Sequence, residues 1–162
     1  MLPPTFRKFN FGSVPAMIRV EVVNTFLVNM GKEFVILLRG TDDERTLPIS
    51  IGQLEAQSIA LQLNEIPFPR PLTHDLFKNV LNELGSTVVR TEICALKDET
   101  FFARLVVQTG DKTVSIDARP SDAIAMALRF SSVSVIKGTN GTRGRTSITE
   151  SRARAWTFLK FS

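Results

Sequence analysis

The sequence predicts a single α+β domain in which a mixed, largely antiparallel sheet is combined with three helices. Alternating apolar runs, rich in β-branched residues, are separated by short polar turns, and short turns can join only antiparallel neighbours. Three further segments have apolar residues at helical spacing. With 162 residues, 43% of them hydrophobic, the chain has room for one domain with a substantial core.

Seven segments have the composition and alternation of strands. The first begins at Met17, after a stretch that is rich in proline and irregular. We therefore expect an N-terminal extension over 1–16, a folded domain over 17–136 and a basic, irregular C-terminal tail over 137–162. The expected strands cover residues 17–28, 33–39, 45–51, 86–96, 101–108, 112–117 and 132–136.

Each expected helix has recognisable ends. The first runs from about Gln53 to Asn64. The second opens with Thr73 as its N-cap and ends at Gly85, and the third runs from Pro120 to about Arg129. We expect one face of the second helix to be apolar, formed by Leu76, Phe77, Val80, Leu81 and Leu84.

The two halves of the domain can be aligned at an offset of 67 residues. This offset pairs Leu38 with Leu105 and Glu55 with Asp122, and each half then reads strand, strand, strand, helix. We predict a degenerate internal duplication with an approximate two-fold axis. Chance matching of alternating apolar runs is the alternative.

Three polar segments lie where a strand or an extended loop leads into a helix N-terminus, over residues 51–56, 69–76 and 116–123. Such a position presents free backbone N–H groups and partial positive charge. It therefore suits a bound phosphate.

Glu55 and Asp122 each fall at the third residue of an expected helix. An acid there favours the helix dipole by ~0.3–1 kcal/mol and can bond the N-cap N–H, so capping alone accounts for both. The functional interpretation is that Glu55, Asp117 and Asp122 converge on Mg²⁺ or Mn²⁺, since such ions prefer carboxylate oxygens. The ion would stabilise charge developing on a phosphodiester and activate water.

His74 is the only histidine, and it lies beside Asp75 at the expected start of the second helix. The positive end of a helix favours a neutral imidazole, which could accept a proton near pH 7. A hydrogen bond to a loop carbonyl is the alternative role. Arg70 and Arg119 each adjoin a proline that restricts the backbone, which suits them to bidentate phosphate contact. Ion pairs with Asp75 or Asp117 are the alternative.

The strings PRPLTHDL at 69–76 and DARPSDAIAMA at 117–127 resemble signature segments of the bifunctional nuclease domain family, as do IGQLEA at 51–56 and LKDETFFA at 96–103. The resemblance extends over roughly residues 17–136. It implies an α+β fold, homo-oligomeric assembly and nuclease activity on RNA and DNA. The tail departs from the family pattern after the third helix, which puts any function of the tail in doubt.

The sequence leaves two classes of function open. The first is a metal-assisted nuclease, and its candidate catalytic residues are His74, Asp75, Glu55, Asp117 and Asp122, with Arg70 and Arg119 on phosphate. The second is a non-catalytic oligomeric module that binds an anionic small ligand or a protein partner.

Charge favours the second class, because only the tail is basic and the rest of the chain is close to neutral. The tail could hold a phosphate backbone or simply be solvated. No apolar run reaches the ~20 residues of a membrane span, no signal peptide is apparent, and Cys94 is the single cysteine, so we expect a cytoplasmic protein without a membrane partner.

Overall fold

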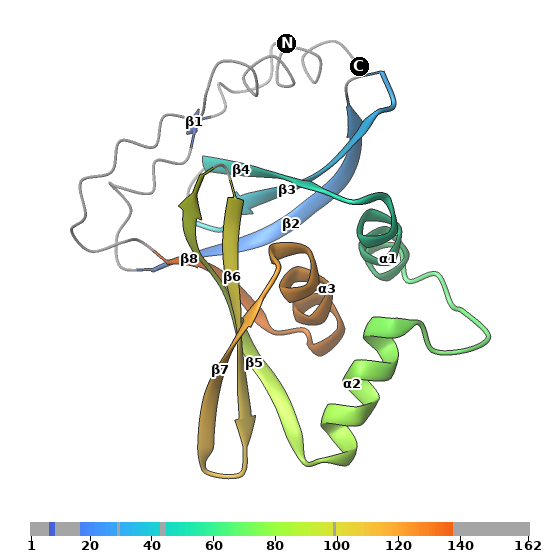
Figure 1. The fold of residues 1–162 in the computed structure, drawn as a ribbon, viewed down its shortest axis with the longest axis vertical. Coiled ribbons are helices and arrows are strands. Elements are labelled where there is room, and N and C mark those ends of the chain that lie inside the picture. The colour runs from blue at the N-terminus through green and yellow to red at the C-terminus, as the bar shows by residue number, and fades with distance from the viewer. Residues whose placement is uncertain (1–6, 9–16, 29, 43–44, 99, 138–162) are drawn as a thin grey trace.

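A computed structural model describes residues 7–8, 17–28, 30–42, 45–98 and 100–137 of the chain. Eight strands form one mixed sheet in the order β1-β4-β3-β2-β8-β5-β6-β7 (Figure 1). The sheet is strongly twisted, since β2 to β4 run across the view of Figure 1 whereas β5 to β7 run down it. The strands are β1 (Arg7–Lys8), β2 (Met17–Val28), β3 (Glu33–Gly40), β4 (Arg45–Ile51), β5 (Ser86–Lys97), β6 (Thr100–Thr109), β7 (Lys112–Ala118) and β8 (Val133–Lys137).

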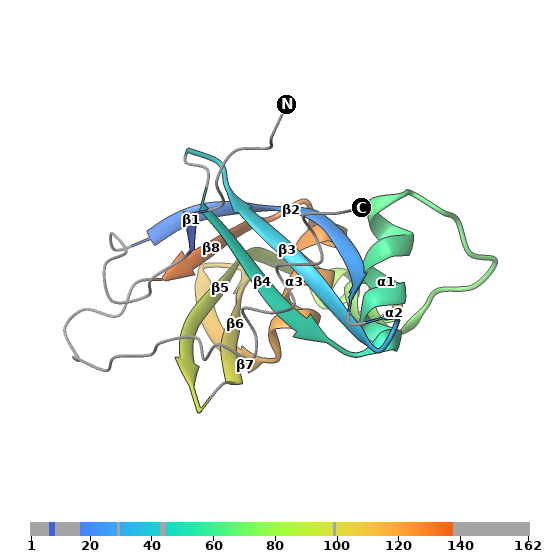
Figure 2. The same cartoon turned by 90° about the horizontal axis from the view of Figure 1, so that it is seen from above.

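Three helices complete the domain: α1 (Gln53–Leu63), α2 (Thr73–Glu83) and α3 (Pro120–Phe130). Helix α3 lies innermost, against β5 and β6, while α1 and α2 flank it, α1 against β2 and β3 and α2 against β5 (Figures 1 and 2). All three helices contribute side chains to one hydrophobic core with the strands. The predicted α+β class and the mostly antiparallel pairing are confirmed.

The order of strands contains a feature that the sequence did not predict. The last strand, β8, lies between β2 and β5, antiparallel to the first and parallel to the second. It thereby joins two three-stranded meanders, β2-β3-β4 and β5-β6-β7, into one sheet. The two-residue strand β1, parallel to β4, was also not predicted.

The two meanders have the arrangement that an internal duplication requires. Their strand orders are alike about β8, and β2 runs opposite to β5, as a two-fold axis normal to the sheet demands. Helices α1 and α3 begin and end at positions that differ by the same 67 residues. In addition, both first strands carry a register irregularity at matching places, after Val22 in β2 and after Val88 in β5.

One detail of the predicted alignment is wrong. In the β3–β4 ladder Leu38 pairs with Leu47, whose counterpart at 67 residues is Val114, and Val114 pairs with Val107. The structural counterpart of Leu38 is therefore Val107, two residues beyond the expected Leu105. A shift of two residues along a strand keeps the same set of side chains on its inward face, so the apolar pattern alone could not detect the shift.

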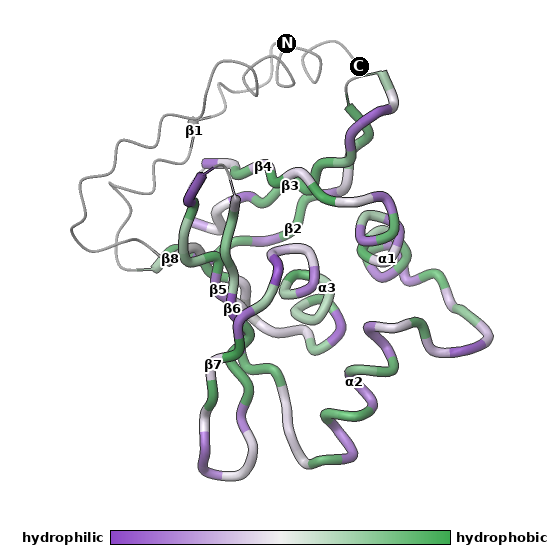
Figure 3. The backbone as a smooth tube through the Cα atoms, viewed as in Figure 1, coloured by the Kyte–Doolittle hydropathy of each residue, from purple (hydrophilic) through white to green (hydrophobic). Residues whose placement is uncertain are grey.

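The apolar face of helix α2 points outward and does not pack against the core. Only Leu81 is buried, whereas four other apolar residues of the predicted face, Leu76, Phe77, Val80 and Leu84, are exposed. The edge of α2 that meets the body carries polar groups instead, including His74 and Asp75, and hydrophobic and hydrophilic residues intermingle along the helix in Figure 3.

The start of α2 also differs by one residue from the prediction. The N-cap is Leu72, not Thr73, and its backbone N–H donates to Asp75 Oδ2 at 2.9 Å. Gly85 follows the helix with a φ of 65°, which confirms its predicted role at the C-terminus.

No helix in the described part of the chain is long and apolar enough to cross a membrane. The predictions for the tail concern residues 138–162 almost entirely, and these lie outside the described residues.

Candidate functional site

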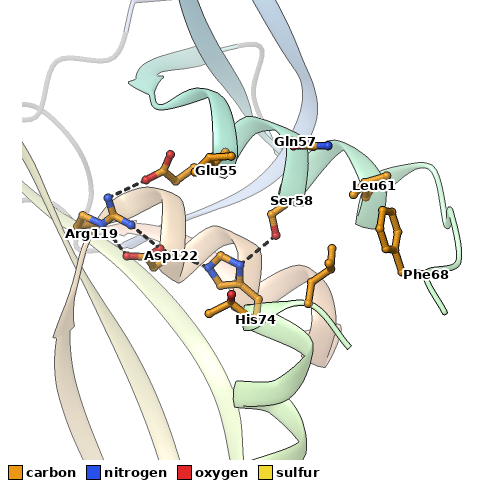
Figure 4. A pocket seen from close by; sticks show the side chains of 11 residues that line it. Glu55, Gln57, Ser58, Leu61, Phe68, His74, Arg119 and Asp122 are labelled. Atoms are coloured by element: carbon orange, nitrogen blue, oxygen red, sulfur yellow. Dashed lines mark hydrogen bonds and ion pairs between the residues drawn. The ribbon is translucent and has the colours of Figure 1, made fainter. Parts of the chain in front are cut away.

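A cavity of about 460 Å³ opens where the N-terminal parts of α1, α2 and α3 meet (Figure 4). The sheet order brings α1 and α3 into contact, and the loop that follows α1 returns α2 beside them. Segments more than 40 residues apart thus contribute to one site. The lining residues are Leu54, Glu55, Gln57, Ser58, Leu61, Phe68, Leu72, Thr73, His74, Arg119 and Asp122.

Arg119 lies between the two acids that the duplication places in equivalent positions. Its Nη1 donates to Glu55 Oε1 at 2.7 Å, and its Nε and Nη2 donate to Asp122 at 2.7 and 3.0 Å. These contacts raise the pKa of Arg119, with the hydrogen bond to Asp122 as the largest cause. Because the Arg119 side chain is 65% exposed, the guanidinium can turn toward an incoming anion without leaving a buried position.

Glu55 and Asp122 lie at the third position of α1 and α3, as predicted, and their carboxylates face each other across Arg119 (Figure 4). The carboxylate of Glu55 folds over Gly52, the N-cap of α1, where even one additional methyl group would collide with it. A glycine at this position therefore lets Glu55 stay close to the start of its helix.

His74 uses both ring nitrogens. Nδ1 is 2.9 Å from Ser58 Oγ on α1, and Nε2 is 3.3 Å from Asp122 Oδ1 on α3. The ring is mostly buried, so these two contacts hold it in a defined orientation. Through His74 the second helix is connected to both of the others.

The Asp122 carboxyl is ionised at neutral pH. Its burial acts to raise the pKa, but hydrogen bonds from Arg119 and His74 outweigh that effect, and the net pKa lies below its ordinary value. A charged Asp122 can therefore accept the hydrogen of a neutral His74 and stabilise the ring when it becomes protonated.

The contacts of Asp75, predicted above as a catalytic residue, are those of a structural group. It accepts a 2.5 Å hydrogen bond from Nε of Arg129, whose side chain is only 3% exposed. Burial acts to raise the pKa of Asp75, but the bonds from Arg129 and the Leu72 N–H outweigh it and lower the net value. Asp75 thus caps α2 and ties it to α3, and it does not line the cavity that holds His74.

Two of the predicted site residues lie apart from this cavity. Asp117 is exposed on β7, where it pairs with Arg104, while its neighbour Ile116 pairs with the core residue Leu105. Because side chains alternate along a strand, Asp117 points to the face away from the helices. Arg70 lines a neighbouring cavity of about 510 Å³ beside the proline-rich loop.

The three-carboxylate ion site predicted from the sequence is accordingly not assembled. Within the described ranges no group of three or more His, Cys, Asp or Glu residues is placed to hold a metal ion. Glu55 and Asp122 are the two carboxylates that come together, with Arg119 between them.

Three residues of the site escaped the sequence analysis. Ser58 lies in the interior of α1 and Arg129 in the last turn of α3, and neither carries a local sign of a polar network. The third, Phe68, lies in the proline-rich loop and is half exposed at the mouth of the cavity. An aromatic residue within a rigid, proline-rich loop was the one signal available in the sequence.

Comparison with known proteins places most of this fold within one family. Residues 36–137 match the family model described as bifunctional nuclease domain. An uncharacterized protein of Mycobacterium tuberculosis is 41% identical over 110 residues, which cover 68% of this chain and 65% of that protein. The chain thus spans about two thirds of the length of this relative.

Plant relatives are more distant and share a smaller part of their length. Bifunctional nuclease 2 of Arabidopsis thaliana is 29% identical over 107 residues, 64% of this chain and 32% of that protein. Bifunctional nuclease 1 of Oryza sativa subsp. indica is 26% identical over 98 residues, 59% of this chain and 30% of that protein.

Proposed function

Because this chain belongs to the bifunctional nuclease domain family, we propose that it hydrolyses phosphodiester bonds of RNA or DNA in the cavity between α1, α2 and α3. The observation that carries the proposal is the division of this cavity into a charged end and an apolar end. Arg119, Asp122 and His74 form the first, and Phe68 and Leu61 lie at the second (Figure 4).

A nucleotide has the same division. Its phosphate suits the guanidinium of Arg119, which offers several donors in a planar fork. Its base can stack on Phe68, a contact worth ~1–3 kcal/mol per base in proteins that bind single strands. The cavity volume lies within the range of about 300–1,000 Å³ found for small-ligand sites.

His74 is the proposed general base, and Asp122 orients it. The hydrogen bond from Nε2 to Asp122 sets the position of the ring and leaves Nδ1 to accept a proton. Removing such a group typically lowers the rate by ~10²–10⁴-fold. Arg119 is the proposed phosphate contact, held ready by Glu55 and Asp122.

A divalent cation fits this donor set. The carboxylates of Glu55 and Asp122 face one guanidinium, that of Arg119, so the site is net negative while His74 is neutral, and an anionic substrate needs that charge offset. Mg²⁺ is commonly bound by one or two carboxylates with water and substrate phosphate completing its shell. Glu55 and Asp122 would hold Mg²⁺ or Mn²⁺ once the exposed guanidinium of Arg119 turns from between them toward the phosphate, and the ion would stabilise charge developing on that phosphate.

The second candidate is a non-catalytic oligomeric module, and the exposed apolar face of α2 favours it. An exposed patch of this kind commonly marks a protein interface. Homo-oligomer formation through α2 is compatible with either function, so the activity assay has to separate them.

The decisive experiment measures cleavage of end-labelled RNA and DNA oligonucleotides, with and without Mg²⁺ or Mn²⁺. We expect Asp122→Asn to lower cleavage by orders of magnitude and His74→Ala by ~10²–10⁴-fold, each with folding retained. Asp111→Asn, in the exposed β6–β7 turn, is the matched control and should cleave like the wild type. Full activity in both site variants would assign the cleavage to another site or to a contaminant.

A further inference from the structure

We propose that Ser58 is the nucleophile of this site and that cleavage passes through a phosphoserine intermediate. The inference rests on the proposed function and adds to it the group that attacks phosphorus. Ser58 lies in the middle of α1, lines the cavity, and contacts residues from both other helices.

The hydrogen of the Ser58 hydroxyl can be placed from its neighbours. Nη2 of Arg129 donates to Ser58 Oγ at 3.2 Å, and a guanidinium has no acceptor to offer in return. Of the two partners that Oγ has among the described residues, only Nδ1 of His74, at 2.9 Å, can accept the hydroxyl hydrogen. The neutral ring must then carry its own hydrogen on Nε2, which faces the carboxylate of Asp122.

This assignment decides which proton His74 can remove. Nε2–H is directed to Asp122, so the free lone pair of the ring is on Nδ1, and Nδ1 faces Ser58. If His74 is a general base, the proton that it takes is therefore that of Ser58. A water molecule could reach Nδ1 only by displacing the hydroxyl.

The surroundings also stabilise both products of that proton transfer. Asp122, whose pKa is lowered, faces the imidazolium, and the buried positive charge of Arg129 faces the serine oxygen. Nucleophile, base and orienting acid thus have the roles of a serine–histidine–aspartate triad, which is recognised by geometry and not by order in the chain. In serine proteases Nε2 of the histidine faces the serine and Nδ1 faces the aspartate, whereas in His74 Nδ1 faces the serine and Nε2 the aspartate.

The proposed reaction has two balanced steps. Ser58 Oγ bonds to phosphorus as its proton moves to His74 Nδ1, and the bond from phosphorus to the leaving sugar oxygen breaks, with that oxygen keeping the electron pair and taking a proton from solvent. Water then attacks the phosphoserine and gives a proton to solvent. The bond from Oγ to phosphorus breaks, and Oγ recovers its proton from His74. In the net reaction, a phosphodiester and water give a phosphomonoester and an alcohol.

The first test does not depend on nuclease activity. Wild-type protein is incubated with diisopropyl fluorophosphate, and the modified residue is identified by peptide mass spectrometry. We expect the phosphoryl adduct on Ser58, unchanged labelling in Ser115→Ala, an exposed serine of β7, and loss of labelling in His74→Ala. No adduct on Ser58, or equal labelling when His74 is absent, would overturn the proposal.

The second test measures cleavage and the intermediate together. Ser58→Ala should lose on the order of 10³-fold or more in cleavage rate while melting cooperatively, and acid-quenched wild type should carry phosphate from a labelled oligonucleotide on Ser58. Cleavage by Ser58→Ala within about threefold of wild type would refute the nucleophile and leave the proposed function standing. Labelling of Ser58 by the fluorophosphate in a protein that cleaves no nucleic acid would instead refute the nuclease and retain the nucleophile. If Ser58→Ala fails to fold, the position of the fluorophosphate adduct in the wild type tests whether Ser58 is the nucleophile.

Discussion

Replacing Arg129 with methionine tests whether a buried ion pair holds α2 against the rest of the domain. The Arg129 side chain, 3% exposed, donates to Asp75 at 2.5 Å, to the Ala125 carbonyl at 3.1 Å and to Ser58 at 3.2 Å. Methionine fills a similar volume without charge, so the main loss is electrostatic and not a cavity.

The size of the effect follows from what remains after the substitution. Breaking a buried pair by removing one partner costs ~3–5 kcal/mol, because the other charge is left unpaired. Asp75 is 32% exposed and keeps the Leu72 N–H, which offsets part of that cost. We therefore expect the free energy of unfolding to fall by about 3 kcal/mol, a large share of the ~5–15 kcal/mol typical of a domain.

Urea denaturation measures this quantity as a shift of the midpoint at unchanged slope. The matched control is Arg39→Met, which breaks the pair with Glu21, half exposed at both ends, and should cost at most ~1 kcal/mol. Adding Asp75→Asn to Arg129→Met should recover part of the loss, since no unpaired carboxylate is left. A loss in Arg129→Met no larger than that of Arg39→Met would refute the reasoning.

Further predictions concern the site and the surface. Asp117→Asn should keep full nuclease activity because Asp117 faces away from the cavity. Loss of activity would show that Asp117 does contribute to the site. Asp75 and Asp122 have folded pKa values below the ordinary 3.8, so their stabilisation is complete above that value. This stabilisation is lost as the pH falls through the pKa values of the folded state. The urea midpoint should therefore decrease less steeply on acidification in Asp75→Asn than in the wild type. Leu84→Lys on the exposed face of α2 should shift the mass measured by light scattering toward the monomer, and an unchanged mass would exclude this face as the contact.

Much of the fold could be predicted because its signals are local. Alternation of apolar residues located the strands β2 to β8 to within about one residue at each end, because a strand's period is visible in its own sequence. Proline at the start of α3 and glycine after α2 marked helix ends that depend on backbone conformation alone. The shared 67-residue offset also predicts that Glu55 and Asp122 occupy equivalent helix positions, as the structure confirms.

The remaining features depend on which segments meet, and a local pattern carries no such information. The place of β8 between β2 and β5 brings the two halves together, and so sets the contact between α1 and α3. The outward apolar face of α2 follows from the same packing, since polar groups on its other edge bond to α1 and α3.

The sequence by itself determined the elements, the helix-terminal acids and the candidate histidine, because each depends on residues within a few positions of one another. Tertiary structure alone decided that Asp117 turns away while Ser58 and Arg129 join His74. The cause is geometric: alternation along a strand reverses a side chain at every residue, whereas hydrogen bonds between helices require distances near 3 Å that only the packed fold specifies.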